Sequence, residues 1–169
     1  MSKKKNIFQR ALNRFLSVLA RFGPGAEGFR PLLHRMRGVQ ILGRVFIAED
    51  VLLETEYPEC IEIQDNVAIS IRAVIIAHTR GPGKVVLEKN SFIGPNAVLV
   101  CPVGRTLTVG EGAVVSAGAV ITRSVPSKSM VAPAPSRTVA TLEVPLTTDV
   151  SMEQFLAGMK MLRPPGNRR

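Results

Sequence analysis

The stretch from Val85 to Val125 reads VVLEKNSFIGPNAVLVCPVGRTLTVGEGAVVSAGAVITRSV, and its aliphatic residues recur every six positions. With the residues upstream, this aliphatic row consists of Ile41, Ile47, Leu53, Ile63, Ile69, Ile75, Leu87, Ile93, Leu99, Val109, Val115 and Ile121. A second row of mostly small residues follows most of these by four positions and consists of Val45, Val51, Val67, Ala73, Ser91, Ala97, Ala113, Ala119 and Val125. A period of six fits neither one face of a helix nor a simply alternating strand. It predicts a chain that turns a corner every six residues, so that three short strands form one coil of a parallel β-helix.

Three segments interrupt this period and predict loops that leave the coils. Residues 54–60 (ETEYPEC) contain Pro58, which cannot pair regularly inside a strand. Residues 78–84 (HTRGPGK) are rich in glycine and proline, and extra residues are inserted around 101–105. Cys60 and Cys101 lie in strand-like contexts, and we expect them to be free thiols rather than a disulfide.

Three of these segments carry a resemblance to a known family: IEIQDNVAISIRAVIIAH (61–78), SFIGPNAVLV (91–100) and LTVGEGAVVSAGAVITRSVP (107–126). They resemble the hexapeptide-repeat acyltransferases, including the maltose and galactoside O-acetyltransferases, and the resemblance covers residues 39–139. It implies an all-β fold, a left-handed parallel β-helix that works as a homotrimer and uses acetyl-CoA as co-substrate. The left hand rests on the resemblance, because parallel crossovers are otherwise right-handed.

The charge of the chain is concentrated at its beginning. Residues 1–37 hold nine Lys or Arg and one acid, Glu27, which leaves thirteen basic against twelve acidic residues in the remainder. The near-neutral coils carry no basic patch interleaved with aromatic residues, so we expect no nucleic-acid partner. We therefore expect a basic N-terminal helical segment at 1–37, a β-helix acyltransferase domain at 38–140, and a C-terminal helix and tail at 141–169.

An amphipathic helix is predicted in the basic segment. An apolar seam follows helical spacing and consists of Phe8, Leu12, Phe15, Leu19 and Phe22. A basic stripe with Arg10, Arg14 and Arg21 lies on the other side, and three lysines precede both. One interpretation is a helix on an anionic membrane, which makes residues 1–22 a peripheral contact at the inner surface of a cytoplasmic protein. The other is a cap whose seam covers the open end of the solenoid or a neighbouring subunit.

The C-terminal segment carries a second helix signal. Ser151 and Gln154 have the spacing of a capping box, in which each side chain bonds to the backbone of the other residue. This predicts a short helix of about eleven residues. The longest uncharged run of the whole chain, residues 90–104, is too short to span a bilayer.

The chain has two histidines, and His78 is the candidate catalytic residue. It ends the run AVIIAH and begins the loop TRGPGK, which places it at a corner of the coils. In the resembled family, a histidine at this place is the general base. A neutral imidazole can take the proton of an attacking hydroxyl or amine and pass it to the leaving thiolate. The alternative is a loop histidine with a surface hydrogen bond; His34, outside the coils, is expected to be structural or solvent-exposed.

Coenzyme contacts follow from the resemblance. The family motif G-A-G-S-V-V-T-K matches residues 116–123 (SAGAVITR), which implies contacts from Ala117, Thr122 and Arg123. A later family segment matches residues 131–139 (VAPAPSRTV), where Arg137 takes the place of a lysine. Pro133 and Ala134 replace the usual glycine and asparagine, and this departure leaves the contacts to the nucleotide part in question.

The acceptor site is less well marked in the sequence. The resemblance implies an asparagine one coil before the histidine, but the chain has Ser70 and Arg72 there. We expect Arg72 either to bind an acidic acceptor or to be an outward surface charge. The loop at 54–57 offers Glu56 and Tyr57 as further acceptor contacts, and it could supply a carboxylate that orients His78, a lid, or surface charges only.

Counting ligands argues against a metal. Gamma-class carbonic anhydrases share this fold and bind zinc with three histidines, whereas this chain has one histidine in its coils. The resemblance therefore implies an acetyl-CoA-dependent O-acetyltransferase that acts on a saccharide or a similar small hydroxyl acceptor, by direct transfer with His78 as base. N-acylation of an amino sugar and a non-enzymatic trimeric β-helix scaffold stay open as alternatives.

Overall fold

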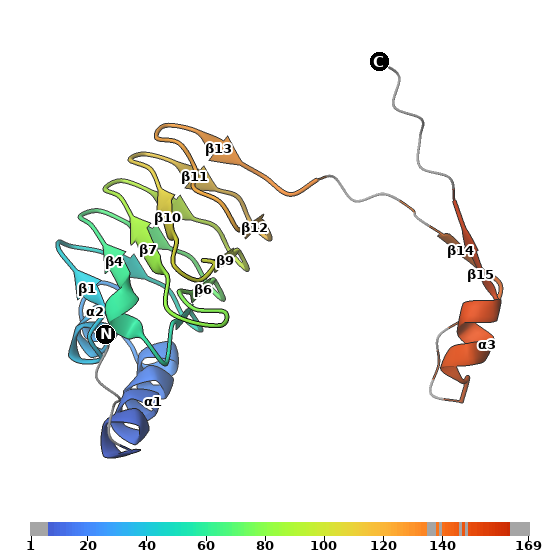
Figure 1. The fold of residues 1–169 in the computed structure, drawn as a ribbon, viewed down its shortest axis with the longest axis horizontal. Coiled ribbons are helices and arrows are strands. Elements are labelled where there is room, and N and C mark those ends of the chain that lie inside the picture. The colour runs from blue at the N-terminus through green and yellow to red at the C-terminus, as the bar shows by residue number, and fades with distance from the viewer. Residues whose placement is uncertain (1–6, 135–137, 139, 146, 148, 163–169) are drawn as a thin grey trace. The chain divides into compact units, whose positions relative to one another are not determined.

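The computed structural model describes residues 7–134, 138, 140–145, 147 and 149–162 of the 169-residue chain. The chain divides into two compact units, Met1–Pro133 and Ala134–Arg169. The first unit begins with two helices, α1 (Ile7–Phe22) and α2 (Phe29–Met36), and continues as a stack of short parallel strands (Figure 1). The division into 1–37, 38–140 and 141–169 stays a prediction of the sequence.

Each turn of the first unit contributes one strand to each of three parallel sheets. The first sheet has the order β1 (Gln40–Ile41), β4 (Ile61–Ile63), β7 (Lys84–Leu87) and β10 (Thr106–Val109). The second has the order β2 (Phe46–Ile47), β5 (Ala68–Ile69), β8 (Phe92–Ile93), β11 (Val114–Val115) and β13 (Met130–Val131). The third has the order β3 (Leu52–Leu53), β6 (Val74–Ile76), β9 (Val98–Val100) and β12 (Val120–Ile121). This is the predicted β-solenoid.

Both six-residue rows point into the core of the solenoid. Every member of the aliphatic row is at most 9% exposed, and every member of the small-residue row is at most 4% exposed. A strand of two or three residues places one side chain inward and its neighbours outward, because side chains alternate across a strand. One aliphatic residue per strand is therefore enough to fill the narrow interior. Cys60 and Cys101 are both free, as predicted.

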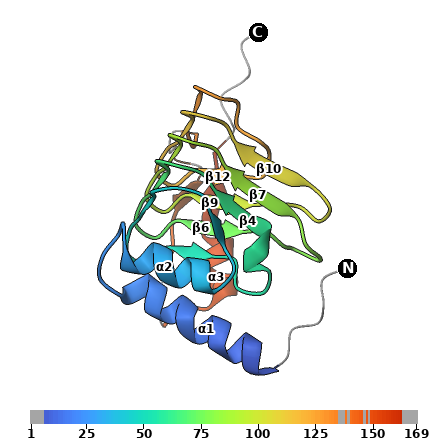
Figure 2. The same cartoon turned by 90° about the vertical axis from the view of Figure 1, so that its left-hand side faces the viewer.

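Helices α1 and α2 lie side by side across the end of the solenoid that begins with β1 (Figure 2). Three arginines of this region bond to carbonyl groups at the open strand edge, one arginine for each sheet. Arg35 donates to Ile41 O and Gly43 O, Arg30 to Ile47 O, and Arg37 to Leu53 O and Glu54 O. An open edge otherwise presents unpaired backbone groups, so these side chains cap the solenoid.

The face of α1 that packs on the solenoid is not its apolar seam. The buried residues of α1 are Asn13, Leu16, Ser17 and Ala20, whereas the seam residues Phe15 and Phe22 are largely exposed. With about 100° per residue, the centre of the seam lies about 130° from the centre of the buried face. The interpretation of α1 as a cap is therefore wrong in one respect, because the helix covers the end of the solenoid with its small and polar side.

The second unit combines a hairpin with a short helix. Strand β14 (Ala140–Leu142) pairs antiparallel with β15 (Met159–Met161), and α3 (Met152–Ala157) lies between them in sequence. The predicted capping box of Ser151 and Gln154 is present. The helix has six residues rather than about eleven, because Gly158 ends it and the next residues join the hairpin.

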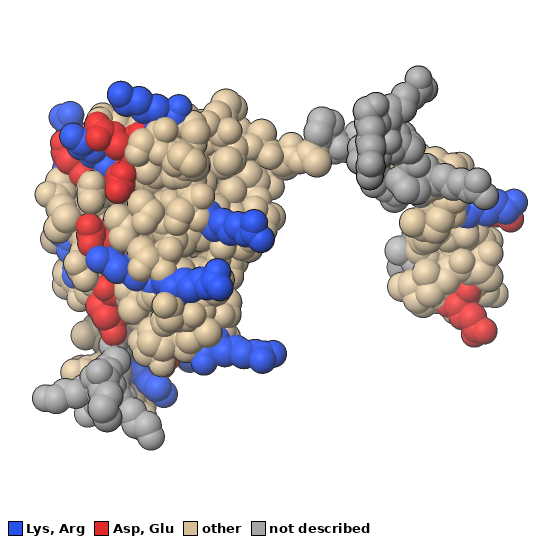
Figure 3. Space-filling model, turned by 45° about the horizontal axis from the view of Figure 1, so that its top comes forward, with Lys and Arg blue, Asp and Glu red and all other residues tan. Residues whose placement is uncertain are grey.

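The coil surface carries few charges relative to its area. The face in view in Figure 3 is mostly free of charged groups, with separate Lys and Arg side chains and acidic groups gathered along one edge. In the part of the chain that the structure describes, no helix is long and apolar enough to cross a membrane.

Candidate active site

Three loops leave the solenoid at the same corner. Residues 54–60 follow β3, residues 77–83 follow β6, and residues 101–105 follow β9, all strands of the third sheet that lead into the first. Because these strands are stacked neighbours, the loops are stacked too. Insertions that gather on one side of a solenoid often form its binding face.

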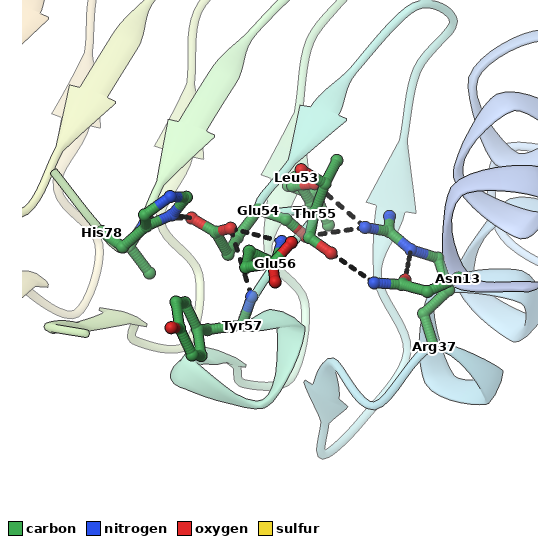
Figure 4. Close-up of polar contacts among 9 residues, drawn as sticks. Asn13, Arg37, Leu53, Glu54, Thr55, Glu56, Tyr57 and His78 are labelled. Atoms are coloured by element: carbon green, nitrogen blue, oxygen red, sulfur yellow. Dashed lines mark hydrogen bonds and ion pairs between the residues drawn. The ribbon is translucent and has the colours of Figure 1, made fainter. Parts of the chain in front are cut away.

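His78 lies in the middle loop of this corner, and its backbone bridges to Pro82. Its Nδ1 atom is 2.6 Å from Glu54 Oε2 (Figure 4). A carboxylate only accepts hydrogen bonds, so the proton lies on Nδ1 and the lone pair on Nε2. The His78 side chain stays 34% exposed. The imidazole is therefore oriented on one side and accessible on the other.

Glu54 is a fully buried carboxylate with a donor for each direction in which it can accept. Its Oε1 atom accepts from the amides of Glu56 at 2.7 Å and Tyr57 at 3.2 Å, and its Oε2 atom accepts from His78 and from the amide of Ala77 at 3.0 Å. Burial by itself raises the pKa of Glu54, but the hydrogen bonds from His78 and the two loop amides outweigh it, and the pKa is lowered. Glu54 is thus ionised in this site.

The loop that carries Glu54 also places Tyr57 and Glu56. The Tyr57 ring meets the His78 ring edge to face, with 5.4 Å between the ring centroids. The Glu56 side chain turns away and pairs with Arg10 of α1 at 2.8 Å. Of the two acidic residues, Glu54 is therefore the one that orients His78, and the interpretation of this loop as carrying surface charges only is wrong for Glu54.

A buried polar network connects Glu54 to the helices at the end of the solenoid. Arg37 donates to Glu54 O at 2.6 Å and to Asn13 Oδ1 at 2.7 Å, and Asn13 in turn donates to Thr55 O (Figure 4). His34 Nδ1 lies 3.0 Å from Arg37 Nη1. Burial lowers the pKa of His34 to about 3, and the charge of Arg37 adds to this effect. His34 is therefore a neutral, buried structural residue and not a solvent-exposed one.

The expected coenzyme residues lie further along the solenoid. Thr122 and Arg123 follow β12 and are exposed at the corner that carries His78, two strands along the third sheet from β6. At 4.7–4.9 Å per strand, this corresponds to about 10 Å along the edge. Ala117 is exposed at the neighbouring corner, where it lies against Gly94; a Cβ at Gly94 would come within 2.6 Å of the Ala117 amide nitrogen. Arg137 lies outside the described residues.

Arg72 is placed apart from this group. It precedes β6 whereas His78 follows it, so up to about 20 Å of extended chain separates the two residues. Arg72 has a φ of 58° at a corner where the stacked neighbours are Asp50, Asn96 and Gly118. Those residue types accept this left-handed conformation more readily than arginine does. Arg72 lies 3.8 Å from the Asp50 carboxylate and is not part of the His78 group within one subunit.

Glu54, Arg37 and Asn13 are the residues of this site that sequence reasoning did not assign. A signal for Glu54 existed: it directly follows Leu53 of the aliphatic row and opens the loop one coil before His78. Arg37 and Asn13 had no such signal, because the six-residue period does not extend into the helices. Among the described residues, no group of three or more His, Cys, Asp or Glu side chains could hold a metal ion.

Several known proteins are similar to this chain. YvoF of Bacillus subtilis (strain 168), which carries the name of an acetyltransferase, is 28% identical over 146 residues that cover 80% of each protein. The 2,3,4,5-tetrahydropyridine-2,6-dicarboxylate N-acetyltransferase of Staphylococcus aureus is 34% identical over 76 residues, which are 44% of this chain and 30% of that enzyme. The crystal structure of the hexapeptide-repeat acetyltransferase VCA0836 of Vibrio cholerae aligns with a TM-score of 0.44 and 20% identity over 73% of this chain and 84% of its own. No protein-family model matches the sequence.

Together, the relatives and the solenoid confirm the hexapeptide-repeat acyltransferase that the sequence predicts. The relatives do not determine the acceptor or the role of any residue.

Proposed function

We propose that this acetyltransferase of the hexapeptide-repeat type transfers the acetyl group of acetyl-CoA to a hydroxyl group of a saccharide or a similar small acceptor, with His78 as general base. The observation that carries the proposal is the buried carboxylate of Glu54 on His78 Nδ1. Taking a carboxylate out of water is costly unless it is fully paired. A residue pair of this kind in a loop-lined corner favours a reactive site over a scaffold.

The proposed reaction needs one base and no covalent intermediate. The acceptor oxygen attacks the thioester carbonyl carbon while its proton moves to His78 Nε2. The carbon–sulfur bond then breaks, the protonated imidazole returns the proton to the thiolate, and the products are the acetyl ester and free coenzyme A. Glu54 stabilises the imidazolium that exists between these steps and keeps the ring in one orientation.

The position of the coenzyme follows the loop-bearing corner. Thr122 and Arg123 lie about 10 Å from His78 along this edge, and Arg123 is an exposed cation that suits a phosphate group. Ala117 approaches the backbone at Gly94 too closely for a side chain at residue 94. We propose that coenzyme A lies along this part of the solenoid with its thioester toward His78.

A homotrimer is part of the proposal. The outward residues of the second sheet include Phe46, Phe92 and Met130, and those of the third sheet are Leu52, Val74, Val98 and Val120. The first sheet instead turns Gln40, Glu62 and Thr108 outward. Two apolar faces on one subunit suit a head-to-tail ring, in which the second sheet of one copy packs on the third sheet of the next.

Acylation of an amino group is the second candidate. The Staphylococcus aureus relative is named as an N-acetyltransferase, although the match spans 30% of its length. The same base can serve both reactions, because an amine also loses a proton when it forms an amide. Arg72, Tyr57 and Glu56 remain the proposed acceptor contacts, with Tyr57 in contact with His78 and Arg72 available to an acceptor only from another side.

The test is a transfer assay with a panel of acceptors. Release of free coenzyme A from acetyl-CoA is followed with sugars, amino sugars and amino acids, and products are identified by mass spectrometry. Treatment with hydroxylamine then distinguishes an O-acetyl ester, which is cleaved, from an N-acetyl amide, which is not. Transfer to hydroxyl acceptors with an ester product supports the proposal. Exclusive amide formation favours the second candidate, and the absence of coenzyme A binding by titration calorimetry favours the scaffold.

A further inference from the structure

The two helices at the end of the solenoid present an exposed apolar surface, which we call the helix-pair face. It consists of Leu12, Phe15 and Phe22 of α1 and Phe29, Leu32 and Met36 of α2, which are between 43% and 67% exposed. The two parts adjoin, since Leu12 and Met36 line the same groove of about 280 Å³ between the helices. Monomeric soluble proteins rarely leave a continuous apolar surface of several bulky side chains in water without a use for it.

The helix-pair face is not needed to hold the helices in place. The solenoid is contacted by the buried side of α1 and by the arginines of the α2 region. Two arginines of the basic stripe are also used there, because Arg10 pairs with Glu56 and Arg21 with Asp50. The apolar residues of the face therefore point away from the interactions that position α1.

The charge around this face selects its partner. Residues 1–37 have a net charge of +8, and no acid occurs before Glu27. Part of this charge is used on the solenoid, but three lysines, Lys3, Lys4 and Lys5, directly precede α1, and Arg14 lies on the helix itself. A second copy of this segment would bring like charges together. An anionic lipid surface instead attracts them and offers an apolar layer to the Phe and Leu side chains.

We infer that the helix-pair face docks this protein on the surface of an anionic lipid bilayer, with α1 and α2 lying in the plane of the headgroups. In a cyclic assembly, faces that point along the axis all point to the same side. Copies of this face at the end of each solenoid would then meet one membrane together and strengthen the binding. Docking would place the His78 corner at the side of the solenoid, near the membrane surface.

The experiment measures binding to vesicles of phosphatidylglycerol and phosphatidylcholine in equal parts, and to vesicles of phosphatidylcholine alone. The test variant is Phe15→Gln with Phe22→Gln, since glutamine is a good helix former and both positions are exposed. The matched control is Met152→Gln with Leu156→Gln, which changes two exposed apolar residues of α3. A third variant, Lys3→Gln with Lys4→Gln and Lys5→Gln, tests the charge. Thermal melts show that each variant is folded.

The expected result is binding of the full chain to the anionic vesicles that weakens with added salt. The Phe15→Gln and Phe22→Gln variant should bind at least about tenfold more weakly, the α3 control should bind like the parent, and the lysine variant should lose most of the salt dependence. Absence of binding to anionic vesicles overturns the inference, as does equal binding by the test variant and the parent. A lower oligomeric mass of the Phe15→Gln and Phe22→Gln variant in light scattering would instead assign the face to a second copy.

Discussion

His78 is useful as a base because its other nitrogen is already committed. Its Nδ1 bonds to a carboxylate that also accepts three backbone amides, so ring rotation would leave a buried charge without a partner. The proposed chemistry therefore depends on two side chains, one that reacts and one that holds it. Substitutions of His78 and Glu54 separate these roles.

Replacement of the base should remove the reaction and little else. His78→Ala should lower acetyl transfer by a hundredfold or more, because general base catalysis contributes about 10²–10⁴-fold. Coenzyme A binding should stay within about twofold of the parent, since the proposed contacts lie on other coils. Turnover is measured with a confirmed acceptor and binding by calorimetry. Parent-like turnover in this variant would contradict the proposed mechanism.

The partner carboxylate should act on turnover more than on acceptor affinity. Glu54→Gln puts an amide nitrogen toward either the Glu56 and Tyr57 amides or Ala77 and His78, and all of these are donors. We expect kcat to fall by about tenfold to a hundredfold, with little change in KM for acetyl-CoA. Glu56→Gln is the matched control, because its side chain faces Arg10. An equal loss of activity in both variants would show that the loop as a whole, and not Glu54, is required.

At the scale of the elements, the α2 region closes the solenoid and also supports the active site. Arg30, Arg35 and Arg37 each bond to the edge of one sheet, but only Arg37 reaches the loop that holds Glu54. It also contacts Asn13 and His34, so both helices are tied to that loop. The cap and the catalytic corner are therefore two ends of one hydrogen-bonded network.

Loss of Arg37 should affect both stability and turnover. Arg37→Met leaves the carbonyls of Leu53 and Glu54 and the Asn13 amide oxygen without their donor, and we expect the free energy of unfolding to fall by about 3 kcal/mol. Turnover should fall as well, because the backbone of Glu54 is no longer held. Arg35→Met, the control on the first sheet, should lose less stability and keep its turnover. Denaturant unfolding and the transfer assay give the two readouts, and unchanged turnover in Arg37→Met would contradict the link.

The buried imidazole of His34 should make the cap sensitive to acid. Its pKa is lowered to about 3 by burial, whereas an unfolded histidine has a pKa of 6.5, so the unfolded chain binds more protons between these values. The stabilising contribution is full above pH 6.5 and is lost toward pH 3, at up to about 1.4 kcal/mol per pH unit. Glu54, whose pKa is also lowered, acts in the same direction below pH 4.5.

A substitution separates these two groups. His34→Asn keeps an acceptor for Arg37 and removes the titration, so its free energy of unfolding should change less between pH 6.5 and pH 4.5 than that of the parent. The measurement is urea unfolding over this range. A parallel pH profile in the variant would show that another group is responsible.

For the whole molecule, the distribution of outward side chains decides how copies assemble. The second and third sheets turn apolar rows outward and the first sheet a polar one. The corner with His78 borders the third sheet, so a neighbour packed on that sheet would complete the pocket. The helix-pair face lies at the end of the solenoid and stays outside such an interface.

The assembly prediction is a trimer that depends on the second sheet. The parent should have the mass of a trimer in light scattering at micromolar concentration. Phe92→Lys places a charge in the middle of the apolar row, so it should dissociate the trimer and reduce transfer. Thr108→Lys, at the matching outward position of the first sheet, should change neither property. A monomeric parent with full activity would contradict both the trimer and the shared pocket.

The sequence by itself determined the solenoid, its core and the corner with the candidate base. A row such as Ile63, Ile69 and Ile75 has a period that only a chain turning every six residues can bury, so this pattern fixed which residues point inward. The same row placed His78 at a corner, where its side chain leaves the core. These features depend on neighbours in the chain, and a single sequence records them.

Only the tertiary structure decided what lies beside His78 and which face of α1 is exposed. Glu54 is 24 residues from His78 and Arg37 is 17 residues from Glu54, and their contacts arise because coils and helices stack across those gaps. The seam of α1 has the pattern of a buried face, but the solenoid end accepts Asn13, Ser17 and Ala20 because polar and small groups fit against its carbonyl edge. Amphipathic spacing shows that a helix has two sides. Which side meets the protein depends on the surface that it finds there.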